Sequence, residues 1–556
     1  MRTLRTLRAL SLPLFATLAI ATTGVIACGG GGQGSGSSPT CKDFSCADAG
    51  TGLSDDGGYA PPAPVDAACV ANGGADLPDD DFADSNCDGI DGDRAHAIFV
   101  APAGNDSSPG ALETPLKTIA KALTIAASSH KDVYVCTGTY AENVAVAQGV
   151  GIYGGYDCTH GWQRTNDRAT IAPSKGIPLS MRDVASAVTI DRVTLKAADA
   201  YDASASSIAA LVVRSANVTL NHASLEAGRG ADGAMPDPPK ARTGTATAGG
   251  DGQALPPITC SLNATAQPAA CSSFGAAGFR SGDFTHEGLG GQGGRGGNIR
   301  MTPGDAHPGG SGGPSGLGGT GGVGVDGFSG LPGTDGASGK SAMVGVGAFN
   351  ADGYVASNVG ADGAAGSPGG GGGGGAGGAT ESDGISAYCV GGGGGQGGYG
   401  GAGGDAAKGS GAGGASIALV AIDSAVSLVR TQIATSTGGR GGASVSGAPG
   451  QLGGAGGKGG VGTVGVRFAH DCDAHSGGFG AHGGGGGAGG AGGGGPAIGI
   501  FSNAASPKTS GVTFNIGTAG RGGSGAVSDG ADGVTAEIMA ASVTDGGATD
   551  AGDAGH

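Results

Sequence analysis

The sequence is poor in aromatic and charged residues. Aromatic residues make up 4% of the 556-residue chain, and Trp162 is its one tryptophan. A single large conventional core is therefore not expected. The 29 basic residues are outnumbered by 46 acidic ones, giving a net charge of −17. This balance argues against nucleic acid and anionic lipid as partners, and it suits solubility or cation binding. Neither an H-E-x-x-H motif nor a Walker lysine motif occurs.

Glycine, by contrast, supplies 129 of the 556 residues, about three times its usual share of ~7%. It falls at every third residue in long runs, which span 318–339, 360–378, 392–404, 447–465 and 477–495. Polyproline-II geometry has three residues per turn, so each run predicts a helix with a glycine stripe along one edge. Collagen shares this period but needs far more proline than the runs hold. The runs also resemble the glycine-rich repeats of mycobacterial PGRS surface proteins.

The register favours a bundle of extended left-handed helices beside the rest of the fold. Disordered low-complexity loops remain the alternative, because ordering glycine has the largest backbone entropy cost. Within the last run, Gly483, Gly486 and Gly489 are expected to face neighbouring helices. The glycines one residue later, Gly484, Gly487 and Gly490, are expected to face a less crowded direction.

The N-terminus predicts export. Three arginines precede an apolar stretch from Leu10 to Ile26, which is the pattern of a signal peptide and not of a membrane span. The stretch ends in Val25-Ile26-Ala27-Cys28, which resembles the lipobox of bacterial lipoproteins. That resemblance implies lipidation of Cys28, and Gly29 in place of aspartate implies the outer membrane, with the membrane as a partner through the anchor. An ordinary signal peptide followed by a chance cysteine is the alternative. Cleavage after Ala27 leaves 29 − 3 = 26 basic residues against 46 acidic ones, a net charge of −20.

Cysteine usage agrees with export. Of 11 cysteines, ten remain after Cys28, and paired cysteines suit an oxidising compartment. Connectivity does not follow from sequence alone. Local spacing favours the pairs Cys41–Cys46, Cys69–Cys87, Cys136–Cys158, Cys260–Cys271 and, by elimination, Cys389–Cys472.

Apolar patterning divides the chain. The divisions are a signal peptide (1–27), an acidic tether (28–95), a β-rich part (96–228), a glycine-rich insertion (229–416), a β segment (417–437), a second insertion (438–496), a final β segment (497–540) and a disordered acidic tail (541–556). Short β-branched runs with turn residues between them fill 96–228. One helix is predicted at 115–128, with Thr114 as N-cap and Pro115 at its first position, packed over the open end of a solenoid.

The β-rich part carries four family landmarks. They are an opening strand and loop at 98–110, Pro-Leu-Lys-Thr-Ile at 115–119, Gly-Thr-Tyr-x-Glu-x at 138–143 and Gly-Gly-Tyr-Asp at 154–157. This region is similar to bacterial right-handed parallel β-helix proteins related in fold to pectate lyases, a largely uncharacterised family with many surface proteins. The resemblance implies an all-β parallel β-helix with one capping helix.

An internal repeat supports the solenoid independently. Segments that begin at Ile208, Ile417 and Ala497 each contain a strand, a polar turn, a second strand and Gly-Arg-Gly. Three coils of one solenoid explain the repeat, and the insertions are then expected to leave from one corner of the coil.

A calcium loop is one of two readings of the tether. Its Asp-x-Asn-x-Asp-Gly core resembles the loops of EF-hands, dockerins and thrombospondin type 3 repeats. The candidate ligands are Asp84, Asn86, Asp88, Asp91 and Asp93. Ala95 stands where an EF-hand has glutamate, and a solvated acidic linker is the alternative.

Enzyme motifs are weak. Gly309–Gly313 fits G-x-S-x-G, but without a strand-turn-helix context. Asp183, Asp191 and Arg192 do not form the residue set of β-helix pectinases, and His470–His475 is read as a polar loop round Cys472. No catalytic residue is predicted.

The expected function is a lipid-anchored surface protein, structural or adhesive, whose partners are polysaccharide or other surface proteins. Polysaccharide binding or cleavage, and binding to ice or mineral surfaces, are the alternatives.

Overall fold

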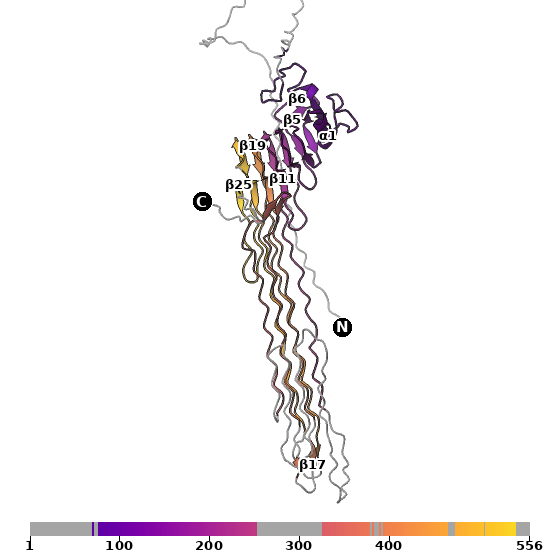
Figure 1. Cartoon of the computed structure of the whole chain (residues 1–556), viewed down its shortest axis with the longest axis vertical. Helices are drawn as coiled ribbons and strands as arrows, with labels where there is room; N and C mark the ends of the chain where they lie inside the picture. The colour runs from indigo at the N-terminus through magenta and orange to yellow at the C-terminus, as the bar shows by residue number, and fades with distance from the viewer. Residues whose placement is uncertain are drawn as a thin grey trace, which may run out of the picture. The chain divides into compact units, whose positions relative to one another are not determined.

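The computed structural model describes residues 69, 71, 76–252, 325–377, 381–382, 388–390, 393–464, 473–504 and 506–540. Backbone contacts divide the chain into Met1–Ala67 and Ala68–His556, and all described residues belong to the second unit. Most of its strands form three parallel sheets. Within the described residues the one α-helix is α1 (Ile119–Ser129), and a short 3-10 helix, η1, spans Arg94–His96. The predicted all-β parallel β-helix is confirmed (Figure 1).

Each sheet collects one strand from each successive coil. Sheet 1 contains β1 (Ala97–Val100), β2 (Asp132–Cys136), β5 (Ile152–Asp157), β9 (Val188–Asp191), β12 (Val218–Asn221), β19 (Val426–Val429) and β23 (Lys508–Ser510), with β6 (Gln163–Arg164) paired to β5. Sheet 2 contains β3 (Gly138–Tyr140), β7 (Ala169–Ile171), β10 (Val193–Lys196), β13 (Ser224–Glu226), β20 (Gln432–Ala434) and β24 (Thr513–Asn515). Sheet 3 contains β4 (Val144–Val146), β8 (Leu179–Arg182), β11 (Ser207–Val213), β18 (Ser416–Ile422), β22 (Ala497–Ser502) and β25 (Thr535–Ala540).

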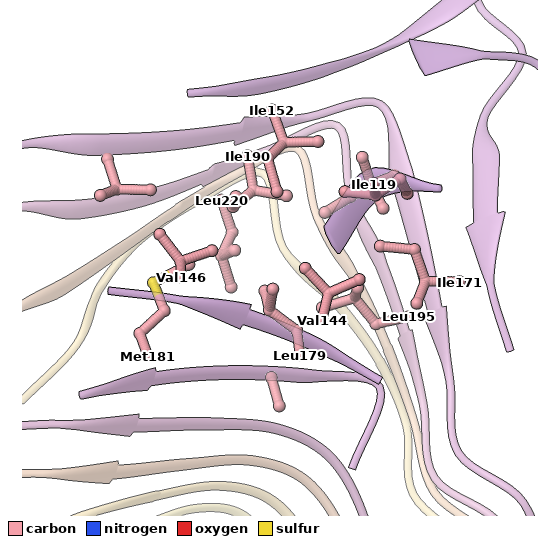
Figure 2. Packing of buried hydrophobic residues seen from close by; sticks show 14 of the residues in the cluster. Ile119, Val144, Val146, Ile152, Ile171, Leu179, Met181, Ile190, Leu195 and Leu220 are labelled. Atoms are coloured by element: carbon pink, nitrogen blue, oxygen red, sulfur yellow. The ribbon is translucent and has the colours of Figure 1, made fainter. Parts of the chain in front are cut away.

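The core lies between the three sheets. Alternate side chains of each strand point inward, and Figure 2 shows Val144, Ile152, Ile171, Leu179 and Ile190 packed toward one another. Each of these side chains is at most 1% exposed. Burial of such a side chain contributes about 1.5–3 kcal/mol. The core therefore forms from short apolar strands that stack on one another, although aromatic residues are scarce.

The middle strands of sheet 3 are buried on both faces. Every residue of β11, β18 and β22 is buried, because a hairpin of β14 (Ala348–Asn350) and β15 (Gly353–Val355) covers its outer face. Phe349 of the hairpin stacks on Phe501 of β22 with ring centroids 3.4 Å apart. The short strands β16 (Glu381–Ser382), β17 (Tyr388–Val390) and β21 (Thr463–Val464) form a separate antiparallel sheet.

Helix α1 begins later than predicted. Its N-cap is Thr118, whose side chain accepts the N–H of Lys121. Leu116 is extended instead, because its N–H donates to Phe99 and its carbonyl accepts from Ala101. The proline-containing start of the motif thus extends the first coil before the helix begins. The helix packs against β1 of that coil and against β2 and β4 of the next one.

The Gly-Thr-Tyr-x-Glu motif anchors the same helix. The carboxylate of Glu142 accepts the N–H groups of Ile119 and Ala120 at 2.9 and 3.0 Å. The hydroxyl of Tyr140 donates to the carbonyl of Cys136 at 2.9 Å. Because the first N–H groups of a helix lack partners within it, Glu142 stabilises the start of α1 from the neighbouring coil.

The insertions leave the β-helix at one corner, as expected. They follow β13, β20 and β24 of sheet 2 and return into β18, β22 and β25 of sheet 3. We name the extended parts segment 1 (228–252), segment 2 (325–342), segment 3 (357–376), segment 4 (393–415), segment 5 (435–462), segment 6 (473–496), segment 7 (516–525) and segment 8 (528–534). The last two lie inside the region read from the sequence as one final coil.

Backbone hydrogen bonds join these segments with a period of three residues. The N–H groups of Gly327, Gly330 and Gly333 donate to Ser476, Phe479 and His482. The same spacing relates segment 6 to segments 3, 4 and 5, and segment 1 to segment 5. This is the period of a polyproline-II helix, and the segments run side by side in Figure 1.

Segment 6 has three sets of positions, each repeating every third residue, and we call each set a frame. The packing of these frames differs from the expected pattern. A Cβ at Gly483 would lie 2.1 Å from the carbonyl oxygen of Ala402, and one at Gly484 would lie 2.0 Å from that of Thr334. Both frames therefore face neighbouring backbone, and the expectation that Gly484, Gly487 and Gly490 are less crowded is wrong. The open direction belongs to Gly485, where the nearest atom to a Cβ is 3.5 Å away. Because segment 6 has neighbouring segments on most sides, it has room for a side chain only in the frame of Gly485.

Candidate functional site

Basic residues stack at the corner between sheets 1 and 2. Arg192, His222 and Arg430 each follow the last residue of a sheet 1 strand, and those last residues, Asp191, Asn221 and Val429, pair across successive coils. All three have positive φ, between 46° and 51°, which is uncommon for residues other than glycine. The sharp turn repeated in each coil therefore places three basic side chains in one row.

One carboxylate from the N-terminal part of the described chain binds this row. Asp80 lies 3.1 Å from Nη2 of Arg192 and 3.4 Å from Nδ1 of His222, and it also pairs with Arg430. Next to it, the ring of Phe82 covers the guanidinium of Arg192 at 4.8 Å. Residues 79–82 thus cover the corner, and Asp80 contacts basic side chains from three coils.

A second carboxylate from the same part of the chain is fully buried. Asp91 contacts Nη1 of Arg164 at 3.1 Å, and Arg164 also pairs with Asp191. The side chains of Arg164, Asp91 and Asp191 are 0%, 1% and 3% exposed. Buried charges need hydrogen bonds as well as ion pairs, and Arg164 also donates to the carbonyls of Gly154 and Asp79.

Burial and neighbouring charges together shift the pKa values of this cluster, and they shift the two carboxylates Asp80 and Asp91 in opposite directions. Burial raises the pKa of Asp80, but the Arg192 hydrogen bond and the charges of His222 and Arg430 outweigh it, so this pKa is lowered from its ordinary value. For Asp91, burial outweighs Arg164 and the pKa is raised. Burial and the charge of Arg192 lower the pKa of His222. Asp80 is therefore the carboxylate whose charged form the site favours most clearly.

The cluster keeps unused hydrogen-bonding capacity. Nε of Arg192 and Oδ1 of Asn221 are buried without a hydrogen-bond partner, and Nδ1 of His222 contacts Asp80 and Asp191 at 3.4 and 3.6 Å without a hydrogen bond. Carboxylate binding is the chemistry that this arrangement performs, and Asp80 is the carboxylate that it holds.

Sequence reasoning found only part of this cluster. It considered Asp191 and Arg192 for catalysis and set them aside, and it missed Asp80, Arg164, His222 and Arg430. The internal repeat held a signal, because a basic residue occupies the same turn position in successive coils. Asp183 lies elsewhere, in an exposed pair with Arg214 whose atoms approach to 2.6 Å.

The five predicted calcium ligands do not share one centre. The carboxylate of Asp91 faces Arg164, and that of Asp93 accepts from the N–H groups of η1 and contacts His96 at 2.7 Å. Asp84, Asn86 and Asp88 accept backbone N–H groups of their own loop. Among the described residues, no group of three or more His, Cys, Asp or Glu side chains is arranged to hold a metal ion. Calcium binding by this loop stays a prediction.

Two of the five expected disulfides are present. Cys69 is bonded to Cys87 and Cys136 to Cys158, with Cα atoms 5.7 and 5.6 Å apart. The first joins the N-terminal part to the loop that carries Asp91, and the second joins neighbouring strands of sheet 1 near their ends. Cys28, the pairs Cys41–Cys46 and Cys260–Cys271, the partner Cys472 and the motif at 309–313 lie outside the described residues.

One comparison with known proteins finds a match. Residues 102–159 are similar to a family described as protein of unknown function (DUF1565). These residues include α1, the Gly-Thr-Tyr-x-Glu strand and the Cys136–Cys158 disulfide. No curated protein and no solved structure matches the chain. In the described part of the chain, no helix has the length and apolar character needed to cross a membrane.

Proposed function

We propose that this protein is a lipid-anchored surface protein of the outer membrane with a structural or adhesive role and no enzymatic activity. The signal-peptide pattern and the Val-Ile-Ala-Cys28 sequence support the anchor. The match at residues 102–159 and the stacked parallel sheets support a β-helix body of the surface-protein kind.

The observation that carries the adhesive role is a row of apolar side chains on segment 2. Val325, Phe328 and Leu331 are spaced by three residues and are 47%, 58% and 51% exposed. Soluble proteins rarely leave adjacent large apolar side chains in water without a use for them. Repeated along one extended segment, they suit many weak contacts made together.

Two variants test the anchor and the adhesive role separately. Cys28→Ala is expected to move the protein from the membrane fraction to the soluble periplasm or to leave an uncleaved precursor. Phe328→Ser with Leu331→Ser is expected to keep the membrane location but reduce adhesion of cells to an apolar surface. The matched control is Thr334→Ser on the same segment. Unchanged partitioning of the first variant, or unchanged adhesion of the second, would reject the corresponding half of the proposal.

A second candidate, binding of acidic polysaccharide, is favoured by the corner row. Arg192, His222 and Arg430 bind a carboxylate, and uronic acids carry the same group. A glycan array of the chain and of an Asp80→Asn variant tests it. Selective binding of acidic glycans that strengthens in the variant would support this candidate, and no acidic preference in either would eliminate it.

A further inference from the structure

The dipeptide Asp-Gly recurs along the described chain. Its aspartates there are Asp88, Asp91, Asp232, Asp251, Asp326, Asp335, Asp352, Asp362, Asp529 and Asp532. This dipeptide can rearrange without an enzyme, because the backbone nitrogen of the glycine can attack the carboxyl carbon of the aspartate. Glycine has no Cβ that would obstruct the attack. The dipeptide is the same at every position, so its folded surroundings decide where the reaction occurs.

In the glycine-rich segments, most of these pairs hold one residue of a neighbouring segment by two hydrogen bonds. The carboxylate of Asp232 accepts the N–H of Arg440 at 2.7 Å, and the N–H of Gly233 donates to the carbonyl of the same arginine at 2.7 Å. Both groups that would have to react are therefore bound to another segment. The same pattern joins Asp251-Gly252 to Lys458, Asp326-Gly327 to Ser476 and Asp335-Gly336 to Gly485.

The remaining carboxylates outside the hairpin of β14 and β15 are also held. Asp362, Asp529 and Asp532 each accept a backbone N–H group. In the N-terminal part of the described chain, Asp88 also accepts a backbone N–H group, and Asp91 is 3% exposed. A carboxylate held in this way must first break its hydrogen bonds before its carbon can reach the glycine nitrogen.

The hairpin places Asp352 in different surroundings. This residue lies in the turn between β14 and β15, and its side chain is 86% exposed. Its carboxylate lies 3.3 Å from Nη2 of Arg182, which is exposed as well, and an exposed pair of this kind holds its partners weakly. A two-stranded hairpin is only marginally stable by itself, so the turn opens more readily than the sheets beneath it. Among the described Asp-Gly pairs, Asp352-Gly353 is therefore the least restrained.

We propose that Asp352-Gly353 is a site of spontaneous isomerisation to isoaspartate. The nitrogen of Gly353 bonds to the side-chain carboxyl carbon of Asp352, and one water molecule leaves as a cyclic succinimide forms. Water then adds to the backbone carbonyl of the ring, and the bond from that carbonyl to the Gly353 nitrogen breaks. The chain now runs through the side-chain carbons of residue 352, and the former backbone carbonyl becomes a free carboxylate. This inference goes beyond the proposed surface role and does not depend on the anchor.

The turn lies where a longer backbone has a structural effect. Gly353 has a φ of 111°, and a Cβ there would lie 2.7 Å from Cδ1 of Ile208 in β11. Isomerisation adds one carbon atom to the backbone between Asn350 and Gly353, which are paired in the hairpin. The hairpin then cannot keep both its register and its contact with Ile208. We expect it to loosen from sheet 3, where Phe349 stacks on Phe501.

Peptide mapping of the full chain during incubation at neutral pH tests the proposal, with isoaspartate located by mass spectrometry. In the folded chain, we expect isoaspartate to form at Asp352 at least about tenfold faster than at Asp232 or Asp335, which corresponds to a ~1.4 kcal/mol lower free energy of local opening. In the chain unfolded in urea, the three rates should become similar, because the dipeptide is the same. Equal rates in the folded chain, or isoaspartate at Asp352 only after unfolding, would overturn the proposal.

A matched pair of variants tests the structural effect. Asp352→Ser removes the carboxyl group and keeps a small polar side chain in the turn. Amide exchange of residues 348–355 should become faster in the parent as isoaspartate accumulates, and it should stay constant in this variant. Asp529→Ser, in the turn between segments 7 and 8, is the control and should change with time as the parent does. Equal loss of protection in Asp352→Ser, or isoaspartate at Asp352 without faster exchange, would show that isomerisation does not loosen the hairpin.

Discussion

The carboxylate of Asp80 lies 3.1 Å from the guanidinium of Arg192, a residue 112 positions later in the chain. This pair ties the N-terminal part of the described chain to the turn after β9, and the same carboxylate pairs with Arg430, 350 positions away. Without Asp80, a row of three basic side chains would have no acidic partner from residues 79–82.

Asp80→Asn is therefore expected to destabilise the protein by about 1–2 kcal/mol. Hydrogen bonds to charged groups contribute more than neutral ones, but the side chain is 36% exposed, so solvent screening reduces the effect. Amide exchange of residues 79–82 should become faster. Asp81→Asn is the matched control: Asp81 is a neighbouring acidic residue whose backbone N–H donates to Asp79, and its carboxylate takes no part in the ion pairs of the corner among the described residues. Equal destabilisation by both substitutions would show that net charge, not the corner, is responsible.

The difference between parent and Asp80→Asn should depend on pH. Because the folded-state pKa of Asp80 lies below its ordinary value of 3.8, its contribution is fully present above that value. It is lost as the pH falls through the folded-state pKa. Denaturant unfolding at pH 7 and at steps below pH 4 measures this. A difference that persists unchanged in acid would mean that the charge of Asp80 is irrelevant.

Single alanine substitutions on segment 6 should separate its three frames. Gly483→Ala and Gly484→Ala are both expected to speed amide exchange and proteolysis of the segments, since each methyl group meets a carbonyl oxygen at 2.0–2.1 Å. Gly485→Ala is expected to be neutral or to stabilise by ~0.4–1 kcal/mol, because alanine narrows the unfolded ensemble. The same response at all three positions, or rapid exchange in the parent, would argue for disordered loops.

Replacing Cys136 and Cys158 together by serine should cost about 3 kcal/mol, the value expected for a closed loop of this size; the two cysteines are 22 residues apart. Peptide mapping without reduction should find this pair and Cys69–Cys87. A free thiol at Cys136 would contradict the structure.

Glu142→Gln should weaken the start of α1 by about 1 kcal/mol, the scale of a lost helix cap. Glu113→Gln is the control, because its side chain is 65% exposed and pairs only with Arg94. Exchange at Ile119 and Ala120 reports the effect directly. Unchanged protection there would show that Glu142 does not cap the helix.

The sequence predicts the fold well where patterns are local. Alternation in short strands, the internal repeat and the three-residue glycine period each follow from residues close together in the chain. The helix start was placed too early, because Thr114-Pro115 fits a helix N-terminus while Leu116 is held by a strand partner at Phe99. The charged corner was missed for a related reason. Asp80 and Arg430 are distant in sequence, and nothing local marks one as the partner of the other.

Because the insertions leave the β-helix at one corner and run side by side, their lengths can change only in certain steps. An outgoing and a returning segment can each gain three residues, about 9 Å, and every hydrogen bond nearer the β-helix keeps its partner. A gain of one or two residues would turn side chains toward the backbone oxygens that now face Gly483 and Gly486. Related chains should therefore differ in this region by steps of three residues in each arm, while their strands stay fixed.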